Sequence, residues 1–576
     1  MSRIFISLVC CCITFTLSAQ VPNFVWARQF GFSKSGTYNL HLAMAPGEQL
    51  LAAGNFTEYA NFAHGSEKYF FDAGKSSDIF FNKTTATGDF LWAKQIRSIR
   101  PGGIVMNAFI TDSQGNIFIT GEYIDTVDFD PDPLVDFKVA AVEKANSDQD
   151  IFIAKYNATG GLLWVKTIGY IDTDIATGLA LLSNGNLIVT GRYRFTVDFD
   201  PGPAVANLSS STQAIFILTL TSDGEYIDAK SISYGGSTNI LDVQLTESDS
   251  DDNLYLSGVY LGTVDFDPGP DKFMVTAPNA GVPSFICKLN KELKCLWVKT
   301  IATTSLGFIP TDLKVNADKA VCLVGTFWQN MEFEPADSTG FSLISAGNSD
   351  AIALKIDSNG TFVWGKHFGS TGSDEATALA IDNNGNWQIG INSRSDSIDV
   401  DPGQATHWLI NSGNYDAALV RLNTEGDFMS MSQFTGQQLQ QINAIVTSSN
   451  AIYTGGTFVG PSDFDPGEGA FSLSPKAGWD FYIQKMSMSP ATIDKIEQFD
   501  DIKLYPNPTC GLFTLARANS TAGHIKIFNS TGGLVKSFPV TSLTCDLDLS
   551  QQTAGLYLVQ LSTEKGGTQT FKILKQ

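Results

Sequence analysis

One acidic phrase recurs along the chain with small changes and at almost constant spacing. It places one acidic residue on each side of a central apolar residue, as in the Asp-Phe-Asp of Thr-Val-Asp-Phe-Asp-Pro-Gly-Pro. A degenerate copy, Asn61-Phe62-Ala63, lies 67 positions before the first full one. The central residues of the full copies, separated by 70, 67, 67, 67 and 64 positions, are Phe129, Phe199, Phe266, Phe333, Val400 and Phe464. This period predicts seven stacked copies of one supersecondary unit.

Each unit carries four strand-like segments, with the acidic phrase between the second and the third. In the third unit the segments are residues 175–182, 186–192, 214–220 and 226–232. A turn that ends in glycine joins the third segment to the fourth in most units, and such a turn pairs its strands antiparallel. We therefore expect an all-β fold, a seven-bladed β-propeller over residues 20–488.

The period is longer than the ~40–50 residues of common blade repeats. The excess lies between the second and third segments, where another apolar pulse follows the acidic phrase. We expect this connection to form an extended hairpin that projects from one face.

The two ends of the repeat region complement each other. Val25-Trp26-Ala27-Arg28 matches the fourth-strand phrase of the other units, although no third strand precedes it. The last unit has the opposite defect, because it stops after its third strand at residues 480–485. We expect strand 23–31 to complete the last blade and so remove two open edges. The recurring Trp residues are expected to pack between blades; a carbohydrate-stacking platform is the alternative.

The N-terminus and the composition indicate an exported protein. Residues 1–19 have the basic start, short apolar run and small-residue boundary of a signal peptide, and no later run reaches the ~20 apolar residues of a membrane span. The formal net charge is -22, which disfavours nucleic acid as a partner.

Five cysteines follow the signal peptide, and their spacing matches no zinc pattern. Two pairs are worth testing as disulfides: Cys287 with Cys295, which flank a hairpin turn, and Cys510 with Cys545 in the C-terminal segment. Each pair could equally consist of free thiols, and Cys322 has no obvious partner. Oligomeric state is not readable from the sequence.

Two phrases, residues 350–360 and 378–386, resemble the bacterial β-propeller repeats of large exported proteins. The resemblance covers residue 20 to about residue 488. It implies a scaffold or binding platform and leaves the ligand open.

Past a linker at residues 489–500 the pattern changes to short alternating strands, which predict a small immunoglobulin-like β-sandwich over residues 501–576. This segment resembles the type A C-terminal sorting domain of the type IX secretion system of Bacteroidetes. The matching motifs are Tyr505-Pro506-Asn507-Pro508, Gly511, the turn at 533–535, Asp548-Leu549-Ser550, Gly555-Leu556-Tyr557-Leu558-Val559 and the basic residues Lys572 and Lys575. The resemblance implies periplasmic passage, recognition by the outer-membrane secretion machinery, and release or surface attachment. The domain is usually removed in that family, and the sequence does not decide whether it is here.

The acidic phrase is the repeated polar constellation of the chain. Residues at alternate strand positions face the same side, so each pair of acids shares a face. Calcium is the candidate ligand, with Asp150, Asp350, Asp416 or Asp480 as further donors. The alternative is that the carboxylates cap turn amides. The candidate metal ligands are Asp128, Asp130, Asp198, Asp200, Asp265, Asp267, Asp399, Asp401, Asp463 and Asp465, and Glu332 and Glu334 take these positions in the fifth unit.

The sequence contains no recognisable catalytic constellation. The histidines are scattered through different units and lie in no nucleophile or metal-binding motif: His41, His64, His367, His407 and His524. We therefore expect a non-enzymatic exported or cell-surface protein that binds a glycan or another surface protein. A secreted polysaccharide-active enzyme on the same platform is the alternative, and a purely structural spacer is a third interpretation.

Overall fold

The computed structural model describes most of the chain as β-structure. The described residues are 21–32, 38–63, 69–99, 103–142, 148–234, 240–278, 281–303, 307–334, 340–476, 478–488, 502–516, 523–529, 533–563 and 568–576. The predicted signal peptide, the predicted linker and His64 lie outside them. All the regular structure in the described part is strand, which confirms the all-β class. The chain divides into two compact units, Met1–Ser489 and Pro490–Gln576.

In the first unit, the described strands pair into seven four-stranded antiparallel groups, which we number as blades in chain order. Blades 1 to 3 are β2 (Tyr38–Ala45), β3 (Gln49–Asn61), β4 (Phe70–Thr84) and β5 (Phe90–Ser98); β6 (Ile104–Thr111), β7 (Ile117–Tyr123), β10 (Asp150–Tyr156) and β11 (Leu162–Ile168); and β12 (Ile175–Leu181), β13 (Leu187–Asp198), β14 (Asn207–Leu220) and β15 (Tyr226–Tyr234).

Blades 4 to 7 repeat this order. They are β16 (Leu241–Ser248), β17 (Leu254–Tyr260), β20 (Ser284–Leu289) and β21 (Cys295–Thr303); β22 (Phe308–Val315), β23 (Val321–Phe327), β26 (Asp350–Ile356) and β27 (Phe362–Phe368); β28 (Asp374–Ile381), β29 (Trp387–Ser393), β32 (Asp416–Leu422) and β33 (Phe428–Gly436); and β34 (Gln440–Thr447), β35 (Ala451–Val459), β38 (Trp479–Ser487) and β1 (Asn23–Phe32).

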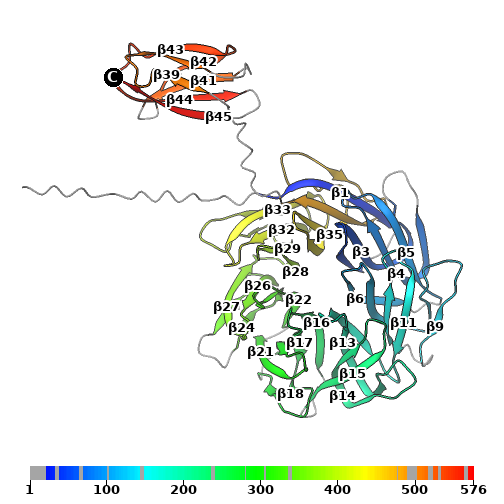
Figure 1. Ribbon diagram of the computed structural model, residues 1–576. Coiled ribbons are helices and arrows are strands. Elements are labelled where there is room, and N and C mark those ends of the chain that lie inside the picture. The colour runs from blue at the N-terminus through cyan, green and yellow to red at the C-terminus, as the bar shows by residue number, and fades with distance from the viewer. Residues whose placement is uncertain are drawn as a thin grey trace, which may run out of the picture. The chain divides into compact units, whose positions relative to one another are not determined.

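The first strands of the blades form the inner wall of a ring. Each of β2, β6, β12, β16, β22, β28 and β34 contacts the next, and β34 contacts β2, so the circle closes. Figure 1 shows β6, β16, β22 and β28 toward the middle of the ring and β11, β15, β21 and β27 toward its rim.

The N-terminal strand is the outer strand of blade 7. In β1 and β38, Trp26 stands opposite Lys485 and Phe30 stands opposite Phe481. The segment that lacks a third strand of its own thereby covers the open edge of β38, as edge protection requires. The end of β1 also pairs with β3, through Gly31 and Asn61, and so joins blade 7 to blade 1.

The hydrophobic core lies between neighbouring blades. One buried cluster combines Phe81 and Ile96 of blade 1 with Phe109 and Phe152 of blade 2. Another combines Phe481 of blade 7 with blade 1 side chains. Both faces of each sheet are covered in this way, which explains why the strands are rich in consecutive apolar residues.

The connections with the acidic phrase form hairpins, but they do not project freely. The short hairpin strands are β8 (Thr126–Asp128) with β9 (Lys138–Ala140), β18 (Thr263–Asp265) with β19 (Met274–Thr276), β24 (Asn330–Phe333) with β25 (Phe341–Ile344), β30 (Ser397–Asp399) with β31 (Trp408–Ile410), and β36 (Ser462–Asp463) with β37 (Ser472–Leu473). Four of them pair with the outer strand of the preceding blade: β8 with β5, β18 with β15, β24 with β21 and β36 with β33. The expectation of a projecting hairpin is therefore wrong for these four, because the outer strand offers free backbone groups nearby.

The second unit is a sandwich of two antiparallel sheets. One sheet contains β39 (Lys503–Tyr505), β40 (Leu512–Ala516) and β43 (Thr544–Asp548), and the other contains β41 (Gly523–Asn529), β42 (Leu534–Val540), β44 (Gly555–Thr563) and β45 (Thr568–Lys575). Its buried cluster draws on both sheets, for example Leu515 from the first and Ile527 and Val559 from the second. Among the described residues, the structure contains no helix with the length and apolar character needed to cross a membrane.

Candidate functional site

The first acid of the phrase closes its own hairpin. Asp265 Oδ1 accepts hydrogen bonds from the backbone N–H of Asp267 at 3.3 Å and of Phe273 at 2.8 Å. These two amides lie at the start and the end of the loop, so one carboxylate oxygen holds both sides together. The same two bonds occur at Asp128, Asp198, Asp399 and Asp463.

The second acid caps the turn that follows it. Asp267 Oδ1 accepts the N–H of Gly269 at 2.8 Å, and its other oxygen accepts the N–H of Cys295 at 3.0 Å. The equivalent turn bond occurs at Asp130, Asp200, Asp401 and Asp465. In these five copies, each aspartate therefore accepts from backbone donors of its own loop or blade.

Two units show what the pattern needs chemically. In the degenerate first unit, Asn61 Oδ1 accepts the N–H of Ala63 at 3.2 Å and of Tyr69 at 2.9 Å, so an amide oxygen replaces the carboxylate. In the fifth unit Glu334 instead accepts the N–H of Thr300 at 2.8 Å and lies 3.5 Å from Lys299. What the units share is an oxygen acceptor for backbone N–H groups, which need not carry a charge.

The carboxylates do not gather into a common centre. Among the described residues, no three His, Cys, Asp or Glu side chains come close enough together to hold a metal ion. In the five copies with two aspartates, the two acids cap different parts of one loop, as described above. Calcium binding stays a prediction. The capping role accounts for the backbone hydrogen bonds of these acids, and Asp128 Oδ2 also accepts from Arg97 of blade 1 at 2.8 Å.

The aspartates at the start of the third strands cap the preceding loop. Asp150 Oδ2 accepts the N–H of Val142 at 2.6 Å, and Asp416 Oδ2 accepts the N–H of Ser412 at 2.8 Å. Asp350 accepts the N–H of Ala346 and lies 2.6 Å from His367 Nε2. The structure thus gives these residues, which were candidates for extra metal donors, a local backbone role.

Blades 2 and 3 contain carboxylates whose pKa is raised toward neutrality. Burial raises the pKa of Glu122 to about 7, against opposing effects of Asn107 and Arg192. Burial also raises the pKa of Asp174 to about 7, and the negative charge of Asp150 adds to this shift. Asp174 Oδ1 is buried without a hydrogen-bond partner.

The sequence analysis did not identify Glu122 as a residue that departs from the repeat. At the position of Glu122 in the second strand, blade 1 has Asn55 and blade 6 has Asn392, and each of these donates to a carbonyl of the next inner strand. Blade 3 has Arg192 there, which forms an ion pair of 2.7 Å with Asp242 of blade 4. The exchange of amides for charges becomes visible only when the strands are aligned position by position.

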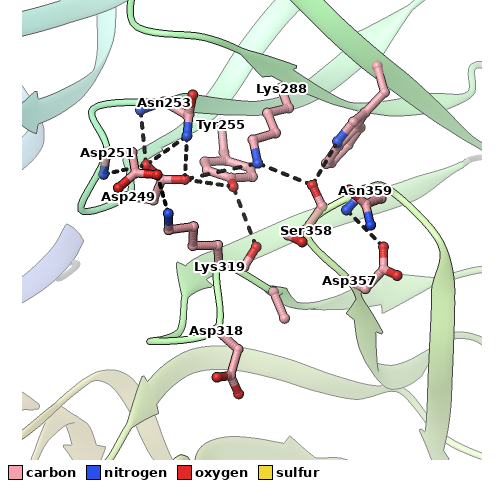
Figure 2. A network of polar contacts seen from close by, with 12 residues as sticks. Asp249, Asp251, Asn253, Tyr255, Lys288, Asp318, Lys319, Asp357, Ser358 and Asn359 are labelled. Atoms are coloured by element: carbon pink, nitrogen blue, oxygen red, sulfur yellow. Dashed lines mark hydrogen bonds and ion pairs between the residues drawn. The ribbon is translucent and has the colours of Figure 1, made fainter.

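A second arrangement joins the blades on the side of the third-to-fourth-strand turns. A Lys on the third strand and a Trp on the fourth strand of one blade donate to one carbonyl oxygen in the turn of the next blade. At the junction of blades 4 and 5, Lys288 Nζ and Trp297 Nε1 lie 3.1 and 3.2 Å from the oxygen of Ser358 (Figure 2). The turn ends in Gly360, where a Cβ would approach the Trp297 ring to 3.0 Å. We call this arrangement the inter-blade latch.

The latch recurs around the ring. Complete copies join blades 7 and 1, 2 and 3, and 5 and 6 through Lys485 with Trp26, Lys155 with Trp164, and Lys355 with Trp364. Between blades 1 and 2, Lys83 makes its bond to Ala158 and a Cβ at Gly160 would meet the Trp92 ring. The prediction that the recurring Trp residues pack between blades is confirmed, and the Lys partner was missed because its acceptor is a carbonyl without any sequence signature.

At the junction of blades 4 and 5 a polar network strengthens the latch. Asp249 accepts the hydroxyl of Tyr255 at 3.0 Å and lies 4.0 Å from Lys288 (Figure 2). Lys319 of blade 5 contacts Asp251 of blade 4 in the same network.

The described histidines lie in different parts of the structure. Burial lowers the pKa of His41 on the innermost strand of blade 1 to about 4, partly countered by Asp312. His407 stacks on Phe428 at 4.3 Å, and His524 lies in the second unit. These contacts of the described histidines involve different parts of the chain.

The motifs of the C-terminal unit converge at one end of its sandwich. Asn507 Nδ2 donates to the carbonyl of Lys572 at 2.8 Å, and its Oδ1 accepts the N–H of Leu574 at 2.9 Å. Lys575 Nζ donates to the carbonyl of Ser550 at 3.0 Å. The proline-containing motif, the Asp-Leu-Ser motif and the basic terminus therefore form one hydrogen-bonded cluster.

This arrangement agrees with a comparison against known families. Residues 503–576 match the secretion system C-terminal sorting domain. The chain is therefore exported by type IX secretion, and the protein is secreted or attached to the cell surface. The sorting domain also implies contact with the secretion machinery.

The chain is also similar, at lower identity, to other proteins. An uncharacterized WD repeat-containing protein, L264 of Acanthamoeba polyphaga mimivirus, is 26% identical over 272 residues, covering 42% of this chain and 19% of that protein. The chain thus spans about a fifth of the curated relative that it matches. Among solved structures, the WD40 repeats of RRP9 are 12% identical with a TM-score of 0.35, over 81% of this chain and 99% of that one. PorZ of Porphyromonas gingivalis, described as a surface component of its type-IX secretion system, is 11% identical with a TM-score of 0.13, over 95% of this chain and 100% of that one.

Proposed function

We propose that the protein is a non-enzymatic binding scaffold that the sorting domain carries to the cell surface or the medium. The observation that carries the proposal is the match of residues 503–576 to the sorting domain. The first unit supports it, because the acids and tryptophans of its repeat are engaged in closing loops and joining blades. We therefore expect the residues that bind a ligand to be ones that depart from the repeat.

The favoured binding surface lies where the inner strands of blades 3 to 5 begin. Tyr170 and Ile171 precede β12, Ile240 precedes β16 and Ile309 lies at the start of β22; all four are exposed. These inner strands contact one another in order, so the four side chains share one sector of the ring. Exposed aromatic and aliphatic side chains suit a glycan or a surface protein.

Two experiments test the proposal. Deletion of residues 503–576 should retain the chain inside the cell envelope, and fusion of these residues to a periplasmic reporter should export the reporter. The purified protein should bind members of a glycan array or a surface-protein panel. Tyr170→Ala with Ile309→Ser should abolish that binding, whereas the control Ile227→Ser on the outer strand of blade 3 should not. Binding unchanged by the double variant would contradict the assignment of the surface.

A polysaccharide-active enzyme is the second candidate function. One observation favours it: the pKa of Glu122 is raised to about 7, near the range of a general acid. Turnover in a polysaccharide screen that disappears in Glu122→Gln would establish the enzyme, and turnover unaffected by that change would exclude this residue as the acid.

A further inference from the structure

One turn in the ring has lost every component of the inter-blade latch. At the junction of blades 3 and 4, Thr219 stands where blades 1, 2, 4, 5 and 7 have the third-strand Lys, and Asp228 stands where these five blades have Trp. Leu293 stands where the turn has Gly, and it adopts a φ of 62°. Neither of the two hydrogen bonds to the turn carbonyl is available at this junction.

The same turn is flanked by two cysteines. Cys287 lies in β20 and Cys295 begins β21, and their Sγ atoms are 3.9 Å apart. The two side chains are 0% and 5% exposed and belong to the cluster between blades 3 and 4. In the strand register Cys295 pairs with Leu289, two positions from Cys287, so the thiols are diagonal neighbours on one face of the hairpin.

We propose that Cys287 and Cys295 form a disulfide in the exported protein, and that this bond stabilises the β20–β21 hairpin of blade 4, whose turn lacks the latch. The thiols need to approach by less than about 2 Å to reach the S–S length, within reach of side-chain rotation. The proposal depends on the export described above, since a stable disulfide requires an oxidising compartment.

The step is a thiol–disulfide exchange with a donor disulfide, such as that of an oxidoreductase or oxidised glutathione. One cysteine thiolate attacks the donor, releases one donor thiol and forms a mixed disulfide; the other cysteine then displaces the second donor thiol. One S–S bond breaks, one forms, and the two cysteines lose two protons and two electrons to the donor. Burial raises the pKa of the Cys287 thiol, so we expect the exchange to accompany folding.

The other cysteines serve as internal controls. Cys322 is buried in β23, and burial raises its pKa to about 12. Cys545 pairs in register with Leu515 of β40, whereas Cys510 lies two residues before β40, and its neighbour Gly511 accepts the N–H of Leu549, four positions beyond Cys545. At ~3.3 Å per residue, the two cysteines lie more than about 10 Å apart. The Cys510–Cys545 pair suggested by sequence is wrong within one sandwich, because a disulfide needs Cα atoms within about 7 Å.

Peptide mapping tests the bond directly. The full chain, exported or refolded with oxidised and reduced glutathione, is denatured without reductant, alkylated and digested with trypsin, which cuts between the two cysteines at Lys288, Lys291 and Lys294. We expect a linked peptide pair joining Cys287 to Cys295, with Cys322 alkylated. Alkyl groups on both Cys287 and Cys295, or a link from either to another cysteine, would overturn the proposal.

Thermal unfolding tests whether the bond stabilises the hairpin that lacks the latch. Dithiothreitol should lower the Tm of the wild type by about 2–4 °C and leave Cys287→Ala with Cys295→Ala unchanged. In that double variant, adding Asp228→Trp with Leu293→Gly should recover part of the loss. The control Cys322→Ala should keep the response to dithiothreitol. The same response in the wild type and the double variant would refute a stabilising disulfide, independently of what the propeller binds.

Discussion

The junctions of blades 4 and 5 and of blades 3 and 4 are equivalent in position and opposite in construction. In the former, Lys288 and Trp297 hold the oxygen of Ser358, and Gly360 leaves room for the Trp ring. In the latter, the donors are absent and Leu293 packs its side chain against the cluster between the blades. A Trp in the first blade requires a Gly in the second, so a single change would be strained and the whole set changes together.

The turns between first and second strands differ in the same way. Between blades 4 and 5 they are joined through Lys319 and Asp251. Between blades 3 and 4 the link is short and made by a hydroxyl: Ser183 donates to Asp252 at 2.7 Å. Every junction of the ring must be closed, and the repeat allows more than one way of closing it.

The largest expected difference concerns the Trp position. Trp297→Ala should lower the free energy of unfolding by about 3–5 kcal/mol, because it leaves a cavity at the junction and removes a donor from the Ser358 carbonyl. Asp228→Ala, at the equivalent position of blade 3, should change it by less than about 0.5 kcal/mol. Urea unfolding measures both, and equal losses would break the distinction between the two junctions.

The turn residue should give the next largest difference. Gly360 has a φ of 86°, and an added Cβ would lie 2.7 Å from Lys299 Cε and 3.0 Å from the Trp297 ring. Gly360→Ala should therefore cost about 2–3 kcal/mol from backbone strain and displacement of the ring. Leu293→Gly should cost less than about 1 kcal/mol, because relief of its positive φ offsets part of the lost packing. A larger loss at Leu293 than at Gly360 in urea unfolding would reverse the interpretation.

A second pair of equivalent positions, Asp374 and Asp174, predicts that the free energy of unfolding changes with pH by about 2 kcal/mol. Asp374 of blade 6 accepts the hydroxyls of Ser393 and Ser395 at 2.6 and 2.8 Å, whereas one oxygen of Asp174 in blade 3 has no partner and its pKa is raised to about 7. The folded state thus holds a proton that the unfolded state releases near pH 4. The stabilising contribution is complete below pH 4 and is lost as the pH rises through about 7.

The measurement compares urea midpoints at pH 5 and pH 8. The wild type should be more stable at pH 5, and Asp174→Asn should reduce the difference because its amide cannot ionise. Asp374→Asn is the matched control and should leave the difference in place while lowering stability at both pH values, since it disturbs two hydroxyl bonds. A pH difference unchanged in Asp174→Asn would show that other groups cause it.

The fold was readable because its signals are repeated or local. The period of the Asp-Phe-Asp phrase indicates the units, and the unpaired Trp26 phrase indicates an edge that needs a partner. The motifs from Tyr505 to Lys575 indicate the sorting domain. The rest depends on neighbours that only the folded ring brings together: the strand that a hairpin joins, the carbonyl that Lys288 reaches, and the amide-to-charge exchange at Glu122.

The smallest expected effect separates the two interpretations of the acidic phrase. If Asp265 acts as an acceptor for the N–H groups of Asp267 and Phe273, Asp265→Asn should cost less than about 0.5 kcal/mol, because Asn61 does the same in blade 1. Asp265→Ala should cost about 1 kcal/mol or more, since both amides lose their partner. Thermal unfolding with and without millimolar calcium measures this, with Asp228→Asn as a surface control. A calcium-dependent rise in Tm that disappears in Asp265→Asn would favour the metal instead, because calcium needs the charge that an amide oxygen lacks.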